Sequence, residues 1–285
     1  MISHVEVLTP KTLAEAYQML QNENGRLKVL AGGTDLMVLV NTGTEVRPAY
    51  MNIWRLNELR GIRDEGGELW IGALTTYTQM IKSALLQVHA PILIEASKQV
   101  GAVQIQNRGT IGGNIVNASP AGDTLPALSV FEAELEIGST NGTRRVSFNK
   151  FYTGYRATVL QKDELLLGIR LPKTSSQHWQ YFRKVGTRQA QAISKVVMAI
   201  WAERAKRDLQ TVRISYGSVA PTVIRAPQTE AMLSGHLLAE DLIEAARQKV
   251  MQEVHPISDV RSTETYRRVI SGNILGRALR ILTKK

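Results

Sequence analysis

The sequence predicts an α+β protein of two domains, with the boundary near residue 172. Before Pro172, short extended runs alternate with helical patterns, and two glycine turns lie among polar residues. After Pro172, three extended runs come first and three helical patterns follow. Strands and helices segregated in this way are typical of α+β domains, and 285 residues with 44% hydrophobic side chains suffice for two cores.

The beginning of the chain predicts a strand–helix–strand unit. Apolar residues at Leu13, Ala16 and Leu20 share one helical face. Thr12, followed three residues later by Glu15, is typical of a capping box at the start of that helix. The sequence predicts a helix over residues 9–20 and strands over residues 4–7, 27–31 and 49–53.

Hairpins and helices are expected between residues 59 and 172, which we take as a second subdomain after one over about residues 1–58. Glu65-Gly66-Gly67 and Asn141-Gly142 predict two hairpin turns. The patterns predict helices over residues 77–86 and 90–100 and a strand over residues 163–171. Residues 104–126 are rich in Gly, Asn, Ser and Thr, and we expect this segment to be too polar and flexible for an ordinary core.

The part after Pro172 predicts an antiparallel sheet followed by helices. Residues 173–176 predict a linker, and Asp208 with Leu209 predicts a turn. Strands are expected over residues 179–184, 193–204 and 211–219. Helices are expected over residues 225–233, 239–254 and 263–282.

The composition excludes several kinds of site. The chain has no cysteine, so it can hold neither a disulfide nor a Cys-ligated zinc or iron–sulfur centre. Its five histidines do not cluster, so we expect no metal site. No apolar run approaches the ~18 residues of a membrane helix, and no signal peptide is evident. We therefore expect no membrane span and a cytoplasmic location.

The net charge of +10 favours acidic protein surfaces as partners. The basic residues near the C-terminus raise the alternative of a nucleic-acid or scaffold-binding protein. They do not form one dense run with interleaved aromatic residues, and residues 266–282 place an apolar stripe on the same helix. The charges are then more simply the solvated face of that helix, and we expect no nucleic-acid partner.

Two glycine turns carry the functional signal. The first follows the strand over residues 27–31 and contains Gly32, Gly33 and Thr34. The second contains Gly112 and Gly113, preceded by Thr110. Paired glycines let successive backbone N–H groups converge on one anion, although one such turn alone is more often an ordinary connection between strands.

Two such turns in one chain fit the two sides of a dinucleotide diphosphate. Neither turn has the G-x-G-x-x-G pattern that opens a helix in nicotinamide-binding domains, and neither has the Walker lysine. The pair of turns therefore points away from a Rossmann domain.

Several segments, in the same order along the chain, resemble the FAD-binding subunits of the molybdenum hydroxylases, the family of xanthine dehydrogenase and aerobic carbon monoxide dehydrogenase. The longest is TIGGNIVNASPAGDTLP at residues 110–126. The others are LAGGTDL at residues 30–36, IGALTT at 71–76, RKVGTR with AIS over 183–194, and YRR with Leu275 and RAL over 266–279.

The resemblance implies a fold and a function. The expected fold is an FAD-binding domain of the vanillyl-alcohol-oxidase (PCMH) type over residues 1–172, followed by a C-terminal domain over residues 173–285 with an antiparallel sheet and a helical bundle. The expected function is electron transfer through FAD to NAD⁺ or another acceptor. Molybdopterin and [2Fe–2S] clusters would lie only on partner subunits, and we expect no catalytic acid or base in this chain.

By the same resemblance, the two turns would hold the FAD diphosphate, helped by the Thr34 and Thr110 hydroxyls. Asp123 would bind a sugar hydroxyl or the adenosine, and Lys184 would lie near the flavin ring and raise its potential. The expected cofactor-binding residues are Val29, Leu30, Ala31, Gly32, Gly33, Thr34, Asp35, Leu36, Thr110, Ile111, Gly112, Gly113, Asn114, Ser119, Asp123, Leu165, Leu166 and Lys184.

Simpler roles remain open for some of these residues. Asp123 can instead cap a helix over residues 124–130, Leu165 and Leu166 can be plain core, and Lys184 can be a solvated lysine on a strand. A second enzymatic hypothesis is a free-standing FAD oxidoreductase of the same fold. Such an enzyme needs its own substrate pocket, and the sequence offers no proton-transfer pair near the turns.

Overall fold

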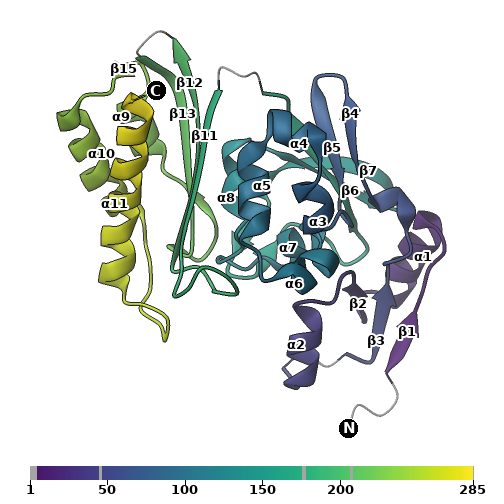
Figure 1. Ribbon diagram of the computed structural model, residues 1–285. Helices are drawn as coiled ribbons and strands as arrows, with labels where there is room; N and C mark the ends of the chain where they lie inside the picture. The colour runs from purple at the N-terminus through teal and green to yellow at the C-terminus, as the bar shows by residue number, and fades with distance from the viewer. Residues whose placement is uncertain (1–4, 45–46, 175–177, 206–207, 285) are drawn as a thin grey trace.

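The computed structural model describes residues 5–44, 47–174, 178–205 and 208–284. Within these ranges, helices and strands are mixed in the N-terminal part, whereas the C-terminal part places an antiparallel sheet before its long helices. The α+β class predicted from the sequence is confirmed. Figure 1 shows the C-terminal sheet standing between its own helices and the N-terminal part of the chain.

A small parallel sheet opens the chain, in the order β1 (Glu6–Leu8), β3 (Ala49–Asn52), β2 (Leu27–Leu30). Helices α1 (Leu13–Glu23) and α2 (Leu36–Asn41) connect these strands. The Thr12 hydroxyl caps α1 by accepting a hydrogen bond from the Glu15 N–H group, while the Glu15 carboxylate accepts one from the Lys11 N–H group. Because β2 and β3 run parallel, their carboxyl ends meet at one edge of the sheet.

A five-stranded antiparallel sheet follows. Its order is β4 (Ile62–Glu65), β5 (Glu68–Gly72), β10 (Leu165–Pro172), β6 (Glu134–Ser139) and β7 (Gly142–Ser147). Both predicted hairpins are confirmed, since β4 pairs with β5 and β6 with β7. Two short strands, β8 (Tyr152–Gly154) and β9 (Ala157–Thr158), pair separately, and single turns of 3-10 helix lie at η1 (Asn57–Leu59) and η2 (Phe148–Lys150).

Five helices pack with this sheet in one apolar core: α3 (Tyr77–Ile81), α4 (Ala84–His89), α5 (Pro91–Lys98), α7 (Ile111–Asn117) and α8 (Leu125–Val130). Helix α6 (Val103–Arg108) has no buried residue. The helix expected over residues 77–86 is two helices, because Ser83 starts α4 by accepting a hydrogen bond from the Leu86 N–H group.

The expectation that residues 104–126 avoid the core is wrong. Ile111 and Ile115 on α7 have no exposed surface, and Leu125 on α8 has 1%. Ile111 and Ile115 are four positions apart, so they lie on the same face of α7. Leu125 is the first residue of α8 and packs in the same core. The polar composition concealed them, because polar residues such as Asp123 and Thr124 are themselves buried and hydrogen-bonded.

The C-terminal sheet has the order β11 (His178–Val185), β12 (Val196–Ala205), β13 (Asp208–Gly217), β14 (Ile224–Arg225), with β15 (His236–Leu237) paired to β13. Helices α9 (Pro227–Leu233), α10 (Glu240–Glu253) and α11 (Glu264–Thr283) follow, as predicted. Two boundaries differ. Strand β12 begins at Val196, not at residue 193, and Leu209 lies in β13, not in a turn, whereas residues 206–207 are outside the described residues. Residues 175–177 of the expected linker are also outside them.

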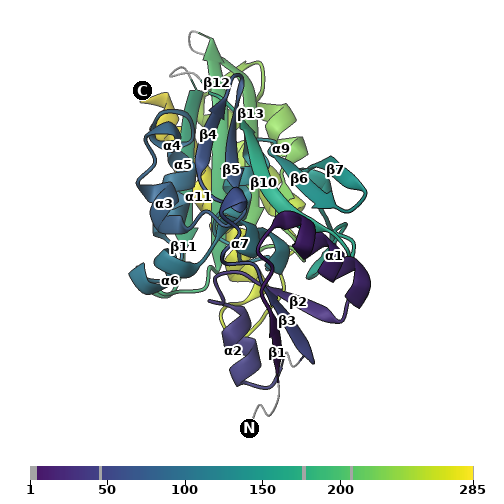
Figure 2. The same ribbon diagram turned by 90° about the vertical axis from the view of Figure 1, so that its right-hand side faces the viewer.

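Strand β12 supplies both faces of the C-terminal sheet. Val196, Met198 and Ile200 pack against helices α10 and α11, whereas Ala199 and Trp201 join the core of the N-terminal part. This alternation follows from the two-residue period of a strand. The sheet therefore packs against one hydrophobic core on each of its faces. Figure 2 shows it behind the five-stranded N-terminal sheet.

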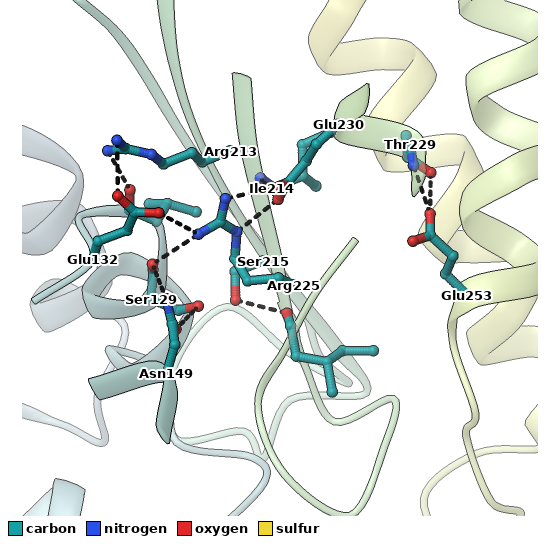
Figure 3. Close-up of polar contacts among 12 residues, drawn as sticks. Ser129, Glu132, Asn149, Arg213, Ile214, Ser215, Arg225, Thr229, Glu230 and Glu253 are labelled. Atoms are coloured by element: carbon teal, nitrogen blue, oxygen red, sulfur yellow. Dashed lines mark hydrogen bonds and ion pairs between the residues drawn. The ribbon is translucent and has the colours of Figure 1, made fainter. Parts of the chain in front are cut away.

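Charged residues also join the two parts of the chain at the end of α8 (Figure 3). The Glu132 carboxylate, on a residue with a φ of 53°, lies 2.9 Å from an Arg213 nitrogen and 3.4 Å from one of Arg225. Arg225 in turn donates two hydrogen bonds, of 2.6 and 2.8 Å, to the carboxylate of Glu230. These contacts fix strands β13 and β14 against the loop after α8.

No helix in the described ranges combines the length and apolar character that a bilayer crossing requires.

Candidate functional site

The first glycine turn lies at the carboxyl edge of the parallel sheet. It follows β2 directly, and the Ile53 N–H group, just beyond β3, donates to the Leu30 carbonyl at 3.0 Å. Gly33 has a φ of +76°, a conformation that side chains with a Cβ rarely adopt. The hydrogen bond from Ile53 therefore fixes the start of the turn, and the backbone conformation at position 33 favours glycine.

Four successive N–H groups of this turn have no acceptor. Those of Gly32, Gly33, Thr34 and Asp35 donate to no atom of residues 5–44, 47–174, 178–205 or 208–284. Backbone donors are normally satisfied, by protein or by another group. This run of open donors is the property expected of an anion-binding turn.

The second glycine turn differs in this respect. Ile111 and Gly112 donate to the Thr75 and Ala73 carbonyls, and Gly113 donates to the Thr110 hydroxyl. The Asn114 N–H group completes the first turn of α7 by donating to the Thr110 carbonyl. Four of the five backbone donors assigned to a diphosphate here are thus already used within the protein. Among the described residues, the polar groups still offered are the Thr110 N–H group, the Thr110 hydroxyl hydrogen and the Asn114 amide nitrogen.

The two turns meet. A Cβ placed on Gly32 would lie 1.9 Å from the Arg108 carbonyl oxygen and 3.3 Å from the Gly109 nitrogen. Position 32 therefore has no room for a side chain, because the backbone before the second turn passes next to it. This contact brings the segments at residues 32 and 108 together at the carboxyl edge of β2.

A buried ion pair lies on the side of the second turn that faces the C-terminal sheet. The Lys184 ammonium on β11 is 2.7 Å from the Asp123 carboxylate and donates a second hydrogen bond of 2.9 Å to the Gln99 carbonyl. The Ser194 hydroxyl donates to the other Asp123 oxygen at 2.5 Å. Burial raises the pKa of Asp123, against the lowering effects of Lys184 and Ser194.

The structure excludes two of the simpler roles left open by the sequence. Asp123 is not the cap of α8, because Thr124 occupies the cap position. Lys184 is not a solvated lysine, since 6% of its side chain is exposed. Leu165 and Leu166 are buried, with 4% and 3% of their surface exposed, and their assignment to the cofactor stays a prediction.

Some residues of the site escaped the sequence analysis. Ser194 lies in one of the family motifs without a predicted role, and its hydroxyl donates a hydrogen bond to Asp123. Trp54, Arg60 and Arg108 were not assigned, although both guanidinium groups lie against the Trp54 ring. The missed signal is the position of Trp54 directly after a strand parallel to β2. Ser119 accepts a hydrogen bond from the Ala121 N–H group, which makes it part of a local turn.

A cavity of about 470 Å³ lies elsewhere, and no residue of either glycine turn lines it. Its wall includes Arg170, Arg213 and Trp201. Arg170 is paired with Glu136, and Arg213 with Glu132. Because none of the residues assigned to the cofactor lines this cavity, the first glycine turn is the better candidate.

The residues of the turns fit FAD. A diphosphate requires several donors at one place and a backbone without bulk, and Gly32 to Asp35 supply both. Asn114 and Thr110 add polar side-chain groups on the second segment.

Comparisons with known proteins identify the family. Residues 3–174 match the family model described as the FAD binding domain in molybdopterin dehydrogenase, and residues 180–282 match the CO dehydrogenase flavoprotein C-terminal domain. The chain belongs to this molybdopterin dehydrogenase flavoprotein family. It is thus an FAD-binding subunit of the molybdenum hydroxylases and a component of an oxidoreductase, as the resemblance implied.

Relatives of this flavoprotein family match over almost the whole chain. The xanthine dehydrogenase FAD-binding subunit of Escherichia coli O157:H7 is 34% identical over 90% of this chain and 88% of its own. The carbon monoxide dehydrogenase medium chain of Hydrogenophaga pseudoflava is 33% identical over 96% and 95%. The structure of that organism's carbon monoxide dehydrogenase lacking the Mo-pyranopterin moiety superposes with a TM-score of 0.95, at 30% identity and 98% coverage of both chains.

Proposed function

We propose that this flavoprotein is the electron-transfer subunit of a molybdenum hydroxylase complex, receiving electrons from the [2Fe–2S] clusters of one partner subunit while another carries the molybdopterin. The electrons would then pass to NAD⁺ or another acceptor. The observation that carries the proposal is the run of four open N–H donors from Gly32 to Asp35 beside the second glycine turn. Bound FAD would supply the chemistry, because it exchanges electrons both singly and in pairs.

The residues of the chain bind and orient. The N–H groups of Gly32 to Asp35, with the Thr34 hydroxyl, would hold the diphosphate, and the Thr110 and Asn114 side chains would contact it from the second segment. Each hydrogen bond to a charged oxygen contributes about 1.5–3 kcal/mol, so several retain a cofactor without a covalent link. Lys184 would lie near the flavin ring and raise its potential, and hydrogen bonds to Asp123 and the Gln99 carbonyl hold its ammonium group in place.

We also propose that the chain divides near residue 172 into the FAD-binding and C-terminal domains. The two parts have separate apolar clusters, one around Phe131 and Leu135 and one around Tyr216 and Leu275. The subdomain division near residue 58 rests on a third cluster, around Leu20 and Met51.

A free-standing FAD oxidoreductase remains the alternative. It would require a substrate pocket with its own proton-transfer groups beside the flavin. Among the described residues at the turns, the one buried acid, Asp123, is matched by Lys184 and Ser194. This arrangement favours the subunit over the free-standing enzyme.

Purification from the native host tests the proposal. The purified protein should show the visible absorption bands of flavin, and molybdenum and iron should co-purify with it in a constant ratio. Flavin without either metal would support the free-standing enzyme. A colourless chain that cannot be reconstituted with FAD would refute both.

A further inference from the structure

Two arginines without a carboxylate partner in the described ranges lie against Trp54 at the carboxyl edge of the parallel sheet, and a third follows Trp54 in the chain. The Arg60 and Arg108 guanidinium carbons lie 4.3 and 3.9 Å from the centre of the Trp54 ring, and Arg55 is the third arginine. Within the described ranges, none of the three is within 4 Å of a carboxylate. By contrast, Arg170, Arg225 and Arg267 each have a carboxylate partner.

Arg60 and Arg108 have different roles in this group. Arg60 is half-buried and donates to the Trp54 and Leu74 carbonyls, at 2.5 and 3.1 Å, so it braces the strand end. Burial, and next the charge of Arg108, lower the pKa of Arg60. The Arg108 side chain is exposed and donates to no atom of the described part of the protein. Stacking on the ring fixes its plane while all five of its N–H donors stay open.

These cations lie beside the open donors of the first glycine turn. Trp54 follows β3 as Gly32 follows β2, and the two strands end at the same edge. The carbonyl of Arg108 itself rests against Gly32. Two neighbouring positive groups without an acid repel one another, and an anion bound beside them removes that cost.

We propose that Arg108, oriented by Trp54 and supported by Arg60, binds a phosphate group of a nucleotide at this edge. The inference rests on the proposed function, because the open donors of the neighbouring turn are there assigned to the FAD diphosphate. The phosphate belongs either to FAD itself or to a dinucleotide acceptor such as NAD⁺, whose reduced form NADH serves as the probe, and the experiment separates these sources.

The test compares Arg108→Gln with Arg277→Gln in the full chain after removal of flavin. Arg277 is also exposed and has no carboxylate partner in the described residues, but it lies on α11, so its loss controls for net charge. The probes are FAD, riboflavin, inorganic pyrophosphate and, for the FAD-loaded chain, NADH. Arg108→Lys keeps the charge but loses the planar group, and thermal unfolding confirms that each variant is folded.

If the phosphate is that of FAD, Arg108→Gln weakens FAD binding by about tenfold to a hundredfold, the effect of one charge-assisted hydrogen bond. Riboflavin binding stays unchanged, Arg108→Lys lies between, and Arg277→Gln resembles wild type. If the phosphate is that of the acceptor, NADH affinity falls instead while FAD affinity is retained. Equal affinities in Arg108→Gln and Arg277→Gln for both nucleotides overturn the inference alone. A wild-type chain that binds neither FAD nor pyrophosphate overturns it together with the proposed function.

Discussion

The Lys184 ammonium and the Asp123 carboxylate form an ion pair of 2.7 Å, with 6% and 10% of their side chains exposed. The pair joins strand β11 of the C-terminal sheet to the loop between α7 and α8. It is completed by the Gln99 carbonyl and the Ser194 hydroxyl, so each charged group has two partners. A pair this deeply buried is stable only because those additional hydrogen bonds exist.

Replacing one partner of this ion pair should lower the free energy of unfolding more than replacing both partners. Asp123→Asn leaves the Lys184 charge buried without its acid, and we expect a loss of about 3–5 kcal/mol in the free energy of unfolding. Lys184→Met leaves the acid, whose pKa burial already raises, so its destabilisation grows as pH rises and the carboxyl loses its proton. The double variant Asp123→Asn/Lys184→Met should recover most of the loss. Denaturant unfolding measures all three, and additive losses in the double variant would contradict the coupling.

Lys184→Met should also lower the midpoint potential of the bound flavin while leaving FAD binding mostly intact. A cation beside the ring favours the negative charge that reduction adds, and the substitution removes it. Spectroscopic redox titration of the loaded chain measures the potential. Lys173→Met, at an exposed ion pair with Asp64, is the control. An unchanged potential in Lys184→Met would count against a role at the ring.

Bulk in the glycine turns should abolish FAD retention. Gly33→Val places a branched side chain at a φ of +76°, and Gly113→Val places a Cβ 2.9 Å from the Thr110 hydroxyl oxygen. Gly32→Ala should act by forcing the two segments apart at the Arg108 carbonyl. Flavin content per chain after gel filtration is the measurement. Gly67→Ala, at a hairpin glycine with open space around it, should keep full flavin content. Full occupancy in Gly33→Val and Gly113→Val would refute the assignment of the turns.

Asp259 should stabilise the protein at neutral pH and cease to do so in acid. Burial raises the pKa of Asp259, but the Arg261 and Ser262 N–H groups and the Arg267 side chain outweigh it and hold the pKa at about 2. Arg267 also donates to the Ser218 carbonyl, and the Ser218 N–H group donates to the Pro120 carbonyl near Asp123. The folded state therefore prefers the ionised carboxylate.

Because the folded-state pKa is lowered, the contribution of Asp259 is complete above the unfolded value of 3.8 and is lost as pH falls through about 2. Asp259→Asn should cost about 2 kcal/mol at pH 7. The difference from wild type should close between pH 4 and 2, as followed by urea unfolding at each pH. A difference that stays constant over that range would show that the effect of the substitution is not electrostatic. Glu58→Gln, at an exposed acid without a partner in the described ranges, should change little.

The order of elements could be read from the sequence because it depends on local patterns. Apolar spacing predicted α10 and α11, and the Asn141-Gly142 turn predicted the pairing of β6 with β7. Local patterns failed where short helices alternate buried and polar residues, as in α7. They also failed at residues 82–83, where Lys82 caps the end of α3 and Ser83 starts α4.

For the site, the sequence by itself determined the two glycine turns and, through the resemblance of its motifs, the family. Only the tertiary structure decided which turn keeps open donors, because the acceptors of the second turn, Thr75 and Ala73, lie on a distant segment. The partner of Asp123 is likewise 61 positions away, on β11. Such contacts depend on how the sheets pack rather than on neighbouring residues. No pattern within one stretch of the chain can therefore specify them.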